Sequence, residues 1–259
     1  MPFCYGNKSC KSRDVCGYAE KLLIENGAEI YRVEETMVRL CKSFKEVQEA
    51  ESFVISTGIM LSITIDGVTH TKVLRTRSKG VDLNCIAQIN ALSRESSTRH
   101  FTIDELHEHL TEIAHMKHYS MGQMLFFSAL SAGGFALFFE GNWTAAFYSF
   151  LIGMVIEAVT LFMNTYHLNN FFINAIASGI AAALALGIHM LDSQADMDIM
   201  IISSIMLLVP GLAITNAIRD TVAGDYVSGV ARALEAVIVA VAIAAGIGFV
   251  LSIGMSGGI

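Results

Sequence analysis

The feature that most constrains the fold is a series of long apolar segments, almost free of charge, that follow Tyr119. A run of about 20 apolar residues is long enough to cross the hydrocarbon core of a membrane as a helix. The core of a water-soluble protein could mimic one such run, but hardly five in succession. The sequence therefore predicts a bundle of about five transmembrane helices, at residues 119–139, 143–163, 168–190, 199–218 and 227–253.

Charge divides the chain at the same place. Of the 17 Lys and Arg residues, 15 precede Tyr119, and only Arg219 and Arg232 follow it. Of the 24 acidic residues, 16 lie in that first part. Such a change in composition marks a domain boundary. We predict a soluble α+β domain at residues 1–118 and a transmembrane helical domain at residues 119–259.

The orientation follows from the N-terminus and the two late arginines. Residues 1–19 lack the apolar core of a secretory signal, so the soluble domain is expected in the cytoplasm. Counting helices from there places the loop with Arg219 inside and the acidic loop 192–198 outside, in agreement with the positive-inside bias. This predicts a multi-pass protein of the cytoplasmic (inner) membrane, with its N-terminus inside and its C-terminus outside.

In the first 118 residues, the spacing of apolar residues indicates helices, then strands, then helices again. Helical spacing of apolar residues predicts helices at 12–26 and 30–44, with Gly27 as the stop of the first. Strict alternation at 59–65, followed by the turn Asp66-Gly67, predicts a hairpin whose second strand is 68–77. Two more helices are expected at 82–94 and 103–117, the latter with Thr102 and Glu105 at capping-box spacing.

No cofactor or metal is expected. In a cytoplasmic domain the cysteines favour free thiols, and the first three are six residues apart, which is not a zinc spacing. The histidines before the membrane favour a solvated helix over a metal site. The sequence contains no ATP-binding loop, dinucleotide loop or Ser-His-Asp arrangement, so transport, if present, is expected to be secondary. The cysteines are Cys4, Cys10, Cys16, Cys41 and Cys85. The histidines before the membrane are His107, His109, His115 and His118, which lie near Glu108 and Glu112.

The stretch 210–236, PGLAITNAIRDTVAGDYVSGVARALEA, is the most informative part of the chain. Pro210 and Gly211 interrupt the backbone ladder of a helix, either as a plain kink or as an opening that lines a cavity. Polar residues then crowd the junction of two predicted helices. They are ordinary charges of the interfacial layer or, because ionisable groups at membrane depth are costly, the lining of a polar path. They are Asn216, Arg219, Asp220, Asp225, Ser228, Arg232 and Glu235, of which the last four share one helical face.

Glu157 is a single acid within the second apolar segment. It lies 14 residues after Trp143, roughly 21 Å along a helix at about 1.5 Å per residue. It is a candidate proton-coupling group or a partner of Arg219 or Arg232; alternatively, it reaches the inner surface. An arginine facing a cavity would suit a substrate carboxylate, because a guanidinium binds one with two hydrogen bonds.

Four blocks of the sequence resemble the threonine/serine exporter family, in order and over nearly the whole chain. They are GAEIYRVEETM (27–37), STGIMLSI (56–63), TRSKGVDLNCIAQINALSRE (76–95) and the stretch 210–236. The length and organisation are most similar to the YjjP-type half of this family. The resemblance implies a second membrane half as partner, a small YjjB-type protein, and export of threonine and serine or of succinate.

The resemblance also singles out residues, without assigning their roles. In the front domain they are Gly27, Glu29, Arg32 and Glu34; in the membrane part they are Thr215, Asn216, Arg219, Asp220, Gly224, Asp225, Ser228, Arg232 and Glu235. Spacing alone predicts that Glu29 and Arg32 can meet at i and i+3.

Our hypothesis from the sequence is a proton-coupled secondary exporter of small carboxylates that contacts membrane lipid and a second membrane half, or forms a homo-oligomer. Arg219 and Arg232 would meet the substrate, and Glu157, Asp220, Asp225 or Glu235 would take the proton. No nucleic-acid partner is expected. Two other classes remain: a ligand-sensing or structural subunit without its own pathway, and an intramembrane protease, since Gly224-Asp225 resembles the Gly-Asp pair of such enzymes. No second acid lies in a matching helix.

Overall fold

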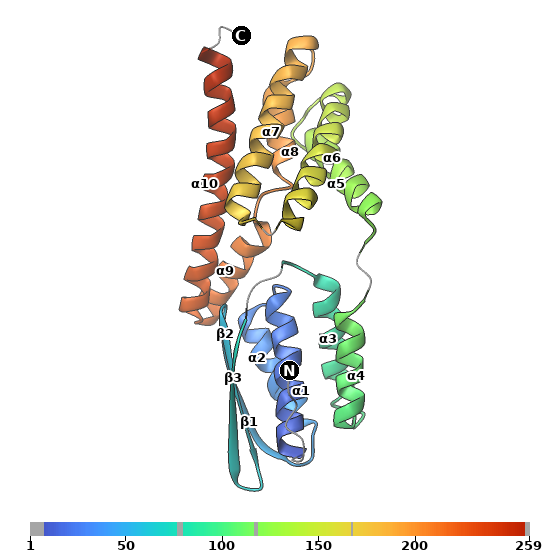
Figure 1. Cartoon of the computed structure of the whole chain (residues 1–259), viewed down its shortest axis with the longest axis vertical. Coiled ribbons are helices and arrows are strands. Elements are labelled where there is room, and N and C mark those ends of the chain that lie inside the picture. The colour runs from blue at the N-terminus through green and yellow to red at the C-terminus, as the bar shows by residue number, and fades with distance from the viewer. Residues whose placement is uncertain (1–7, 77–79, 117–118, 167, 257–259) are drawn as a thin grey trace. The chain divides into compact units, whose positions relative to one another are not determined.

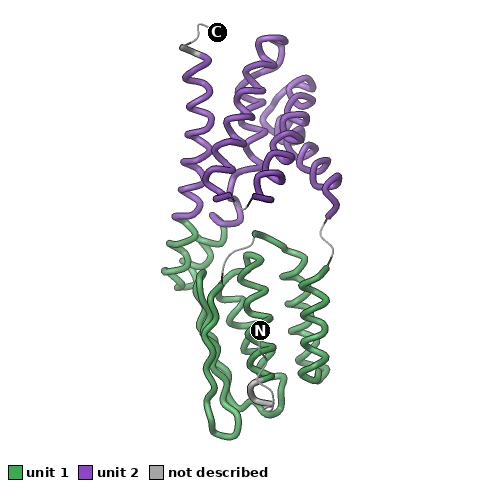
Figure 2. Tube along the Cα trace, viewed as in Figure 1, with its two compact units in different colours: residues 1–117, 215–233 green, residues 118–214, 234–259 purple. Residues whose placement is uncertain are grey.

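The computed structural model describes residues 8–76, 80–116, 119–166 and 168–256. The chain forms two compact units, coloured green and purple in Figure 2. The first contains residues 1–117 and 215–233, and the second contains residues 118–214 and 234–259. The break near residue 118 lies where the change in charge predicts a boundary. The segment 215–233, expected in the membrane part, belongs to the first unit.

The first unit is an α+β unit. Helices α1 (Lys8–Glu25) and α2 (Ile30–Lys42) precede the strands, and α3 (Leu83–Glu95) and α4 (Ile103–Ala114) follow them. These match the four predicted helices, although the residue Lys117 at the end of the last prediction lies outside the described residues. Thr102 and Glu105 form the predicted capping box at the start of α4.

Three antiparallel strands form the sheet, in the order β1-β2-β3, with α1 and α2 beside it in Figure 1. They are β1 (Val47–Ile55), β2 (Gly58–Ile65) and β3 (Val68–Arg75). Asp66 and Gly67 both have positive φ, as a two-residue hairpin turn requires, so the predicted hairpin is confirmed. β1 was not predicted, because charged and polar side chains such as Gln48, Glu49 and Glu51 hide its alternation.

The core of the first unit lies between the helices and one face of the sheet. The alternating residues of β2 that predicted the strand are all buried there. They meet the apolar side of α2, which contributes Ile30, Val33, Met37 and Leu40, each fully buried. The core therefore fixes the position of α2, and with it the turn that precedes α2. The buried residues of β2 are Ile59, Leu61, Ile63 and Ile65.

The second unit is helical. It contains α5 (Met121–Phe138), α6 (Trp143–Thr165), α7 (Asn170–Leu191), α8 (Met197–Ile205), the first residues of α9 (Gly211–Ala223) and most of α10 (Tyr226–Ser256). Among the described residues, four helices are long and apolar enough to cross a membrane. They are α5, α6, α7 and residues Tyr226–Gly254 of α10. Four of the five predicted segments therefore form helices of sufficient length and apolar composition for a span.

Small residues set the spacing of these helices. A side chain on Gly153 of α6 would come within 2.6 Å of the Ala132 side chain of α5, and one on Gly133 within 3.1 Å of the Ala146 carbonyl oxygen. Without a hydrophobic driving force between helices in lipid, close backbone approach of this kind is a main source of attraction. The buried centre is accordingly rich in alanine, including Ala177 and Ala181 of α7.

The prediction of one helix across residues 199–218 is wrong. α8 ends at Ile205, a turn follows in which Leu208 N donates to Ile205 O at 2.8 Å, and α9 begins at Gly211. Pro210 explains the break, since it has no amide hydrogen and its ring obstructs a helix through the preceding turn. α9 then continues to Ala223, past the predicted end.

Candidate functional site

The turn between α1 and α2 is the first part of the site. Gly27 has φ of +86°, and its amide donates to Ile24 O at 3.1 Å while Ala28 N donates to Leu23 O at 3.0 Å. These two bonds form the Schellman ending of a helix, which favours glycine at the left-handed position. The predicted stop at Gly27 is confirmed. The turn leaves the carbonyl groups of Gly27 and Ala28 without a place in either helix.

The hairpin formed by the end of α9 and the start of α10 is the second part. Gly224 has φ of +101° and makes the turn, and Asp225 N donates to Asp220 O at 2.8 Å. A side chain on Gly229 would lie 3.0 Å from Ala217 O and overlap the Thr221 hydroxyl. The two helix ends therefore approach more closely than larger residues permit, and the polar side chains of α9 and α10 come together.

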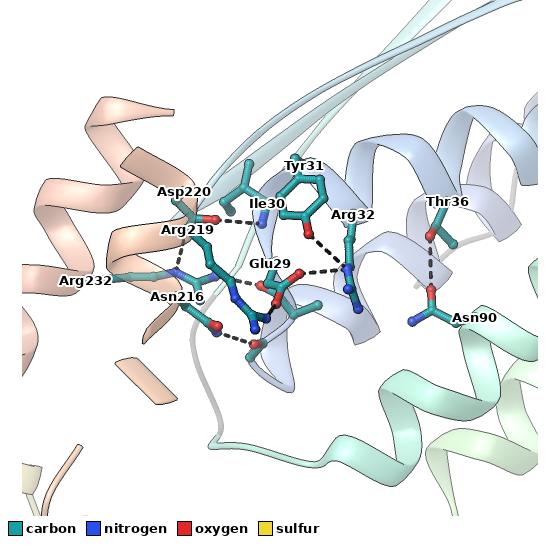
Figure 3. Close-up of polar contacts among 12 residues, drawn as sticks. Glu29, Ile30, Tyr31, Arg32, Thr36, Asn90, Asn216, Arg219, Asp220 and Arg232 are labelled. Carbon is teal, nitrogen blue, oxygen red and sulfur yellow. Dashed lines mark hydrogen bonds and ion pairs between the residues drawn. The ribbon is translucent and has the colours of Figure 1, made fainter. Parts of the chain in front are cut away.

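The hairpin holds the turn through three hydrogen bonds to its backbone (Figure 3). Asn216 Nδ2 donates to Gly27 O at 3.0 Å, and Arg232 Nη2 donates to Ala28 O at 2.7 Å. Asp220 Oδ1 accepts from Ile30 N at 3.2 Å. We call these three side chains, Asn216, Asp220 and Arg232, the clamp.

Asp220 caps the N-terminus of α2, although it is distant from α2 in the sequence. The residue in the N-cap position of α2, Glu29, makes no side-chain cap. The first amide of a helix needs an acceptor, and the helix dipole favours a negative charge at this end. The Asp220 carboxylate supplies both, 190 positions away in sequence.

The clamp contains a buried ion pair. Arg232 Nε lies 3.2 Å from Asp220 Oδ2, and the two side chains are only 11% and 0% exposed. Burial raises the pKa of the Asp220 carboxyl above its ordinary value, while the charge of Arg232 and the Ile30 amide act in the opposite direction. A buried carboxylate is tolerated when it is paired and hydrogen-bonded, and both conditions are met here.

Glu29 lies between two arginines. Its Oε1 contacts Arg219 Nη1, and its Oε2 lies 2.7 Å from Arg32 Nε, which confirms the predicted pairing of Glu29 and Arg32. Burial acts to raise the pKa of Glu29, but the hydrogen bond from Arg219 and the nearby cations outweigh it, and the pKa is lowered. The Glu29 side chain is 10% exposed, whereas those of Arg219 and Arg32 are 53% and 56% exposed.

The other predicted site residues are placed elsewhere. In the first unit, Glu34 Oε1 accepts from Val54 N at 2.9 Å, Ser228 is buried in the first turn of α10, and Asp225 lies in the turn before it. The second unit holds Glu157, half-buried in α6, and Glu235, exposed on α10. The break residues Pro210 and Gly211 also belong to that unit. Within the described part of the chain, no group of three or more His, Cys, Asp or Glu residues is arranged to hold a metal ion.

Sequence reasoning missed the partners of the clamp. The backbone groups of Gly27, Ala28 and Ile30 carry no side-chain signal for a contact with α9 or α10. The available signal was indirect: Gly27 and Glu29 stand in one block of the family resemblance, and Asn216, Asp220 and Arg232 stand in another. Nothing in the spacing of these two blocks, about 190 residues apart, links one to the other, whereas the structure brings them into one site.

Comparisons with known proteins agree over most of the chain. The family model described as "Putative threonine/serine exporter" matches residues 14–254. A "Probable succinate transporter subunit YjjP" of Klebsiella aerogenes is 23% identical, over 84% of this chain and 84% of that protein. The protein of the same name from Escherichia coli is 22% identical, over 92% of this chain and 93% of its own length.

One longer relative is matched over only part of its length. A "Probable threonine/serine exporter" of Mycobacterium tuberculosis is 20% identical over 88% of this chain, but the match covers only 43% of that protein. No solved structure matches this chain. The match to the family model over nearly the whole sequence shows that the chain belongs to the threonine/serine exporter family.

Proposed function

We propose that this chain is one membrane subunit of a secondary exporter of small carboxylates. The observation that carries the proposal is the match, over most of both chains, to two proteins named succinate transporter subunits, together with the family membership. The candidate substrates are succinate, threonine and serine, which share a carboxylate and a small polar body. In this proposal the α+β unit lies in the cytoplasm, and the C-terminus lies outside.

The substrate carboxylate is proposed to bind at Arg219 and Arg32. These two half-exposed guanidinium groups share the single carboxylate of Glu29, so the group of three carries one net positive charge. Guanidinium groups bind carboxylates through paired hydrogen bonds, and the exposed side of each arginine is open to a second anion. The lowered pKa of Glu29 keeps it charged, so it orients both arginines without neutralising them fully.

Arg232 has a different role in this proposal. Its guanidinium is engaged by Asp220 and by the Ala28 carbonyl oxygen, and its side chain is only 11% exposed. A group so occupied positions the turn rather than meeting a substrate. We therefore replace the expectation that both late arginines bind the carboxylate: Arg219 binds it, and Arg232 with Asp220 holds the backbone that presents Glu29.

Glu157 is proposed to take the coupling proton. It lies half-buried within a helix long enough to span the membrane, and among the described residues it has no hydrogen-bond partner. One turn later, the buried Thr160 hydroxyl also lacks a partner within the described chain. Polar groups at membrane depth usually pair or line a polar path, so this side of α6 supports a proton route. Asp225 and Glu235 are the remaining candidates for the proton, since Asp220 accepts from Ile30 N and forms the ion pair with Arg232.

The missing half is proposed to come from another membrane protein. Two matched relatives are named as subunits, and the longer relative extends well beyond the matched region. We propose a YjjB-type membrane protein as this partner, with a second copy of the same chain as the alternative. The outward sides of the spanning helices would then contact lipid and this partner.

A regulatory subunit is the second candidate function. The observation that favours it is the clamp, because three residues of the signature stretch hold the backbone of the α+β unit. In this version the unit senses a ligand, and the partner alone conducts.

Efflux of radiolabelled succinate, threonine and serine from cells that co-express this chain and its second subunit tests the proposal. Arg219→Gln should lower the rate at least tenfold at low substrate concentration, mainly through KM. Arg99→Gln, which alters an exposed arginine paired with Glu95 at 3.5 Å, is the matched control and should leave efflux unchanged. Normal efflux in both Arg219→Gln and Glu157→Gln would move the assignment to the regulatory subunit.

A further inference from the structure

Exposed apolar side chains gather beside the turn that the clamp holds. Val81 and Leu83 flank the N-cap residue of α3, and Met116 follows the end of α4; all three side chains are exposed. Asn84 Nδ2 lies 3.8 Å from Met116 Sδ, so the start of α3 and the end of α4 lie together. A side chain on Gly27 would lie 3.3 Å from Val81 Cγ2, which places this group against the turn.

The hairpin of α9 and α10 carries apolar side chains on the side opposite the clamp. Ile218 lies two positions from each clamp residue of α9, about 200° around the helix, and Val222 follows it at a spacing of four. On α10, Val230 likewise lies two positions from Arg232, and Val227 precedes it by three. These four apolar side chains are exposed. The hairpin is therefore amphipathic, with a polar side that holds the turn and an apolar side left open by the described residues.

The two apolar groups lie at one end of the first unit. Asn216 of the hairpin donates to Gly27 O, and Val81 lies against the same glycine. Figure 2 shows residues 215–233 and the C-terminal end of α4 at the same end of this unit. We call these side chains the apolar end; they are Val81, Leu83, Met116, Ile218, Val222, Val227 and Val230.

The apolar end is joined by the chain to helices of membrane-spanning length. Met121, the first residue of α5, follows Met116 by five residues, which is at most about 18 Å of extended chain. The apolar segment of α10 begins inside the hairpin and runs over 29 residues, Tyr226–Gly254. At about 1.5 Å per residue it measures roughly 43 Å, whereas the hydrocarbon core of a membrane is about 30 Å thick. Part of this segment therefore lies outside the core, in an interfacial layer.

A bilayer surface fits the apolar end better than water does. A group of neighbouring exposed apolar side chains, unlike a single one, indicates a surface that is covered in the cell. The interfacial layer of a membrane accepts the apolar side of an amphipathic element to a depth of about 5–10 Å. The bilayer is the surface within reach, because α5 and α10 carry the chain from the apolar end into it.

We propose that the apolar end inserts into the interfacial layer of the bilayer, so that lipid and not water surrounds Val81, Leu83 and Met116. The turn held by the clamp then lies at the membrane surface, with Arg219 beside it. This inference requires that the chain is a membrane protein, but it does not depend on the substrate, the proton or the partner proposed above.

Quenching of tryptophan fluorescence by brominated lipid tests the proposal. The sequence has a single tryptophan, so Trp143→Phe supplies a background without tryptophan for Val81→Trp in the full chain. The protein would be placed in nanodiscs of phosphatidylcholine brominated near the top of one acyl chain, a quencher that acts only at short range. We expect Val81→Trp to lose at least a third of its fluorescence relative to nanodiscs without bromine.

Two other valines of nearly equal exposure are the matched controls. The side chains of Val81, Val68 and Val241 are 55%, 56% and 55% exposed. Val241→Trp, within the apolar segment of α10, should be quenched at least as strongly as Val81→Trp. Val68→Trp, in the first unit, should lose less than a tenth of its fluorescence.

Val68 is a suitable control because it lies at the opposite end of the first unit. Lys72 Nζ lies 2.7 Å from Asp14 Oδ1, and a side chain on Gly17 would lie 3.0 Å from Leu74 Cδ1, so β3 and α1 run in the same direction. The turn after α1 therefore lies beyond the last residues of β3, whereas Val68 is the first residue of this strand.

Leu83→Trp is a second probe of the apolar end and should repeat the result of Val81→Trp. Both probes behaving like Val68→Trp, while Val241→Trp is quenched, would overturn the proposal. Shielding of Val81→Trp from brominated lipid and from acrylamide in the water would show that protein covers this end, and would overturn it as well. The same conclusion would follow if Val241→Trp were not quenched either, since the helix that carries the chain into the bilayer would then be absent.

Discussion

At the scale of single residues, the structure separates two arginines that the sequence presents as equivalent. Arg232 and Asp220 are buried together against the turn before α2, and Arg219 is half-exposed beside Glu29. Both arginines could be identified from the sequence as the only two bases of the membrane part. Their different surroundings could not be predicted, because Glu29 and the Ala28 carbonyl group, which they contact in the turn before α2, lie 190 and 204 residues earlier.

Replacing Asp220 tests the clamp. Asp220→Asn keeps an acceptor for the Ile30 amide but leaves the buried Arg232 charge without its counter-ion. Breaking a buried pair from one side costs about 3–5 kcal/mol, so the variant should melt at lower temperature and the amides at the start of α2 should exchange faster. Asp66→Asn, in a hairpin turn that accepts either residue, is the control. Equal melting of the two variants would contradict the role of the clamp.

The buried carboxyl of Glu20 should make the stability of the first unit depend on pH. Burial raises the pKa of its carboxyl from about 4.5 to about 8, although Ser52 donates a hydrogen bond to it. Between these values the unfolded chain releases this proton and the folded chain keeps it, so the contribution of Glu20 to stability falls as the pH rises. The loss is several kcal/mol over this range, at about 1.4 kcal/mol per pKa unit.

The variant Glu20→Gln removes this contribution. It should therefore be more stable than the parent at pH 8, with a difference that shrinks to nearly nothing at pH 4.5. Thermal melts of the full chain across this pH range measure the effect, with Glu46→Gln as an exposed control. A parent and a Glu20→Gln protein with the same pH dependence would show that the carboxyl is not buried as described.

At the scale of elements, the periodicity of apolar residues predicts a helix or strand that has one buried face. It fails for a segment whose structure is set by contacts with neighbouring elements. The helices of the first unit and the β2–β3 hairpin follow from apolar spacing and turn residues, and the structure confirms them. β1 is an edge strand whose outer positions are charged, so its own pattern is weak. The break between α8 and α9 was signalled by Pro210, yet apolar residues on both sides favoured one continuous span.

A matched pair of glycines tests the packing of α7 against α10. A side chain on Gly246 would overlap the Ala175 carbonyl oxygen, whereas one on Gly248 would meet nothing within 4 Å. Gly246→Ala should lower the melting temperature and increase exchange in α7, since overpacking costs about 1–3 kcal/mol. Gly248→Ala, two residues along the same helix, should not. If both substitutions were neutral, the close approach of these helices would be refuted.

At the scale of the whole molecule, the proposed exporter requires a second membrane half. Affinity purification from native membranes in mild detergent should recover a small membrane protein in a fixed ratio to this chain, identified by mass spectrometry. The Arg219→Gln variant should recover the same amount, because the change affects substrate binding and not assembly. Purification of a homo-oligomer alone would replace the expected partner with a second copy of the chain.

The central claim is that the chain forms part of a carboxylate exporter, and flux measured in proteoliposomes tests it most directly. The purified complex would be reconstituted and loaded on one side with radiolabelled succinate, threonine or serine. We predict saturable flux of at least one substrate that increases with an imposed proton gradient, falls at least tenfold in Arg219→Gln and keeps its rate in Arg99→Gln. Flux of none of the three above that of empty liposomes, with an intact complex, would contradict the account.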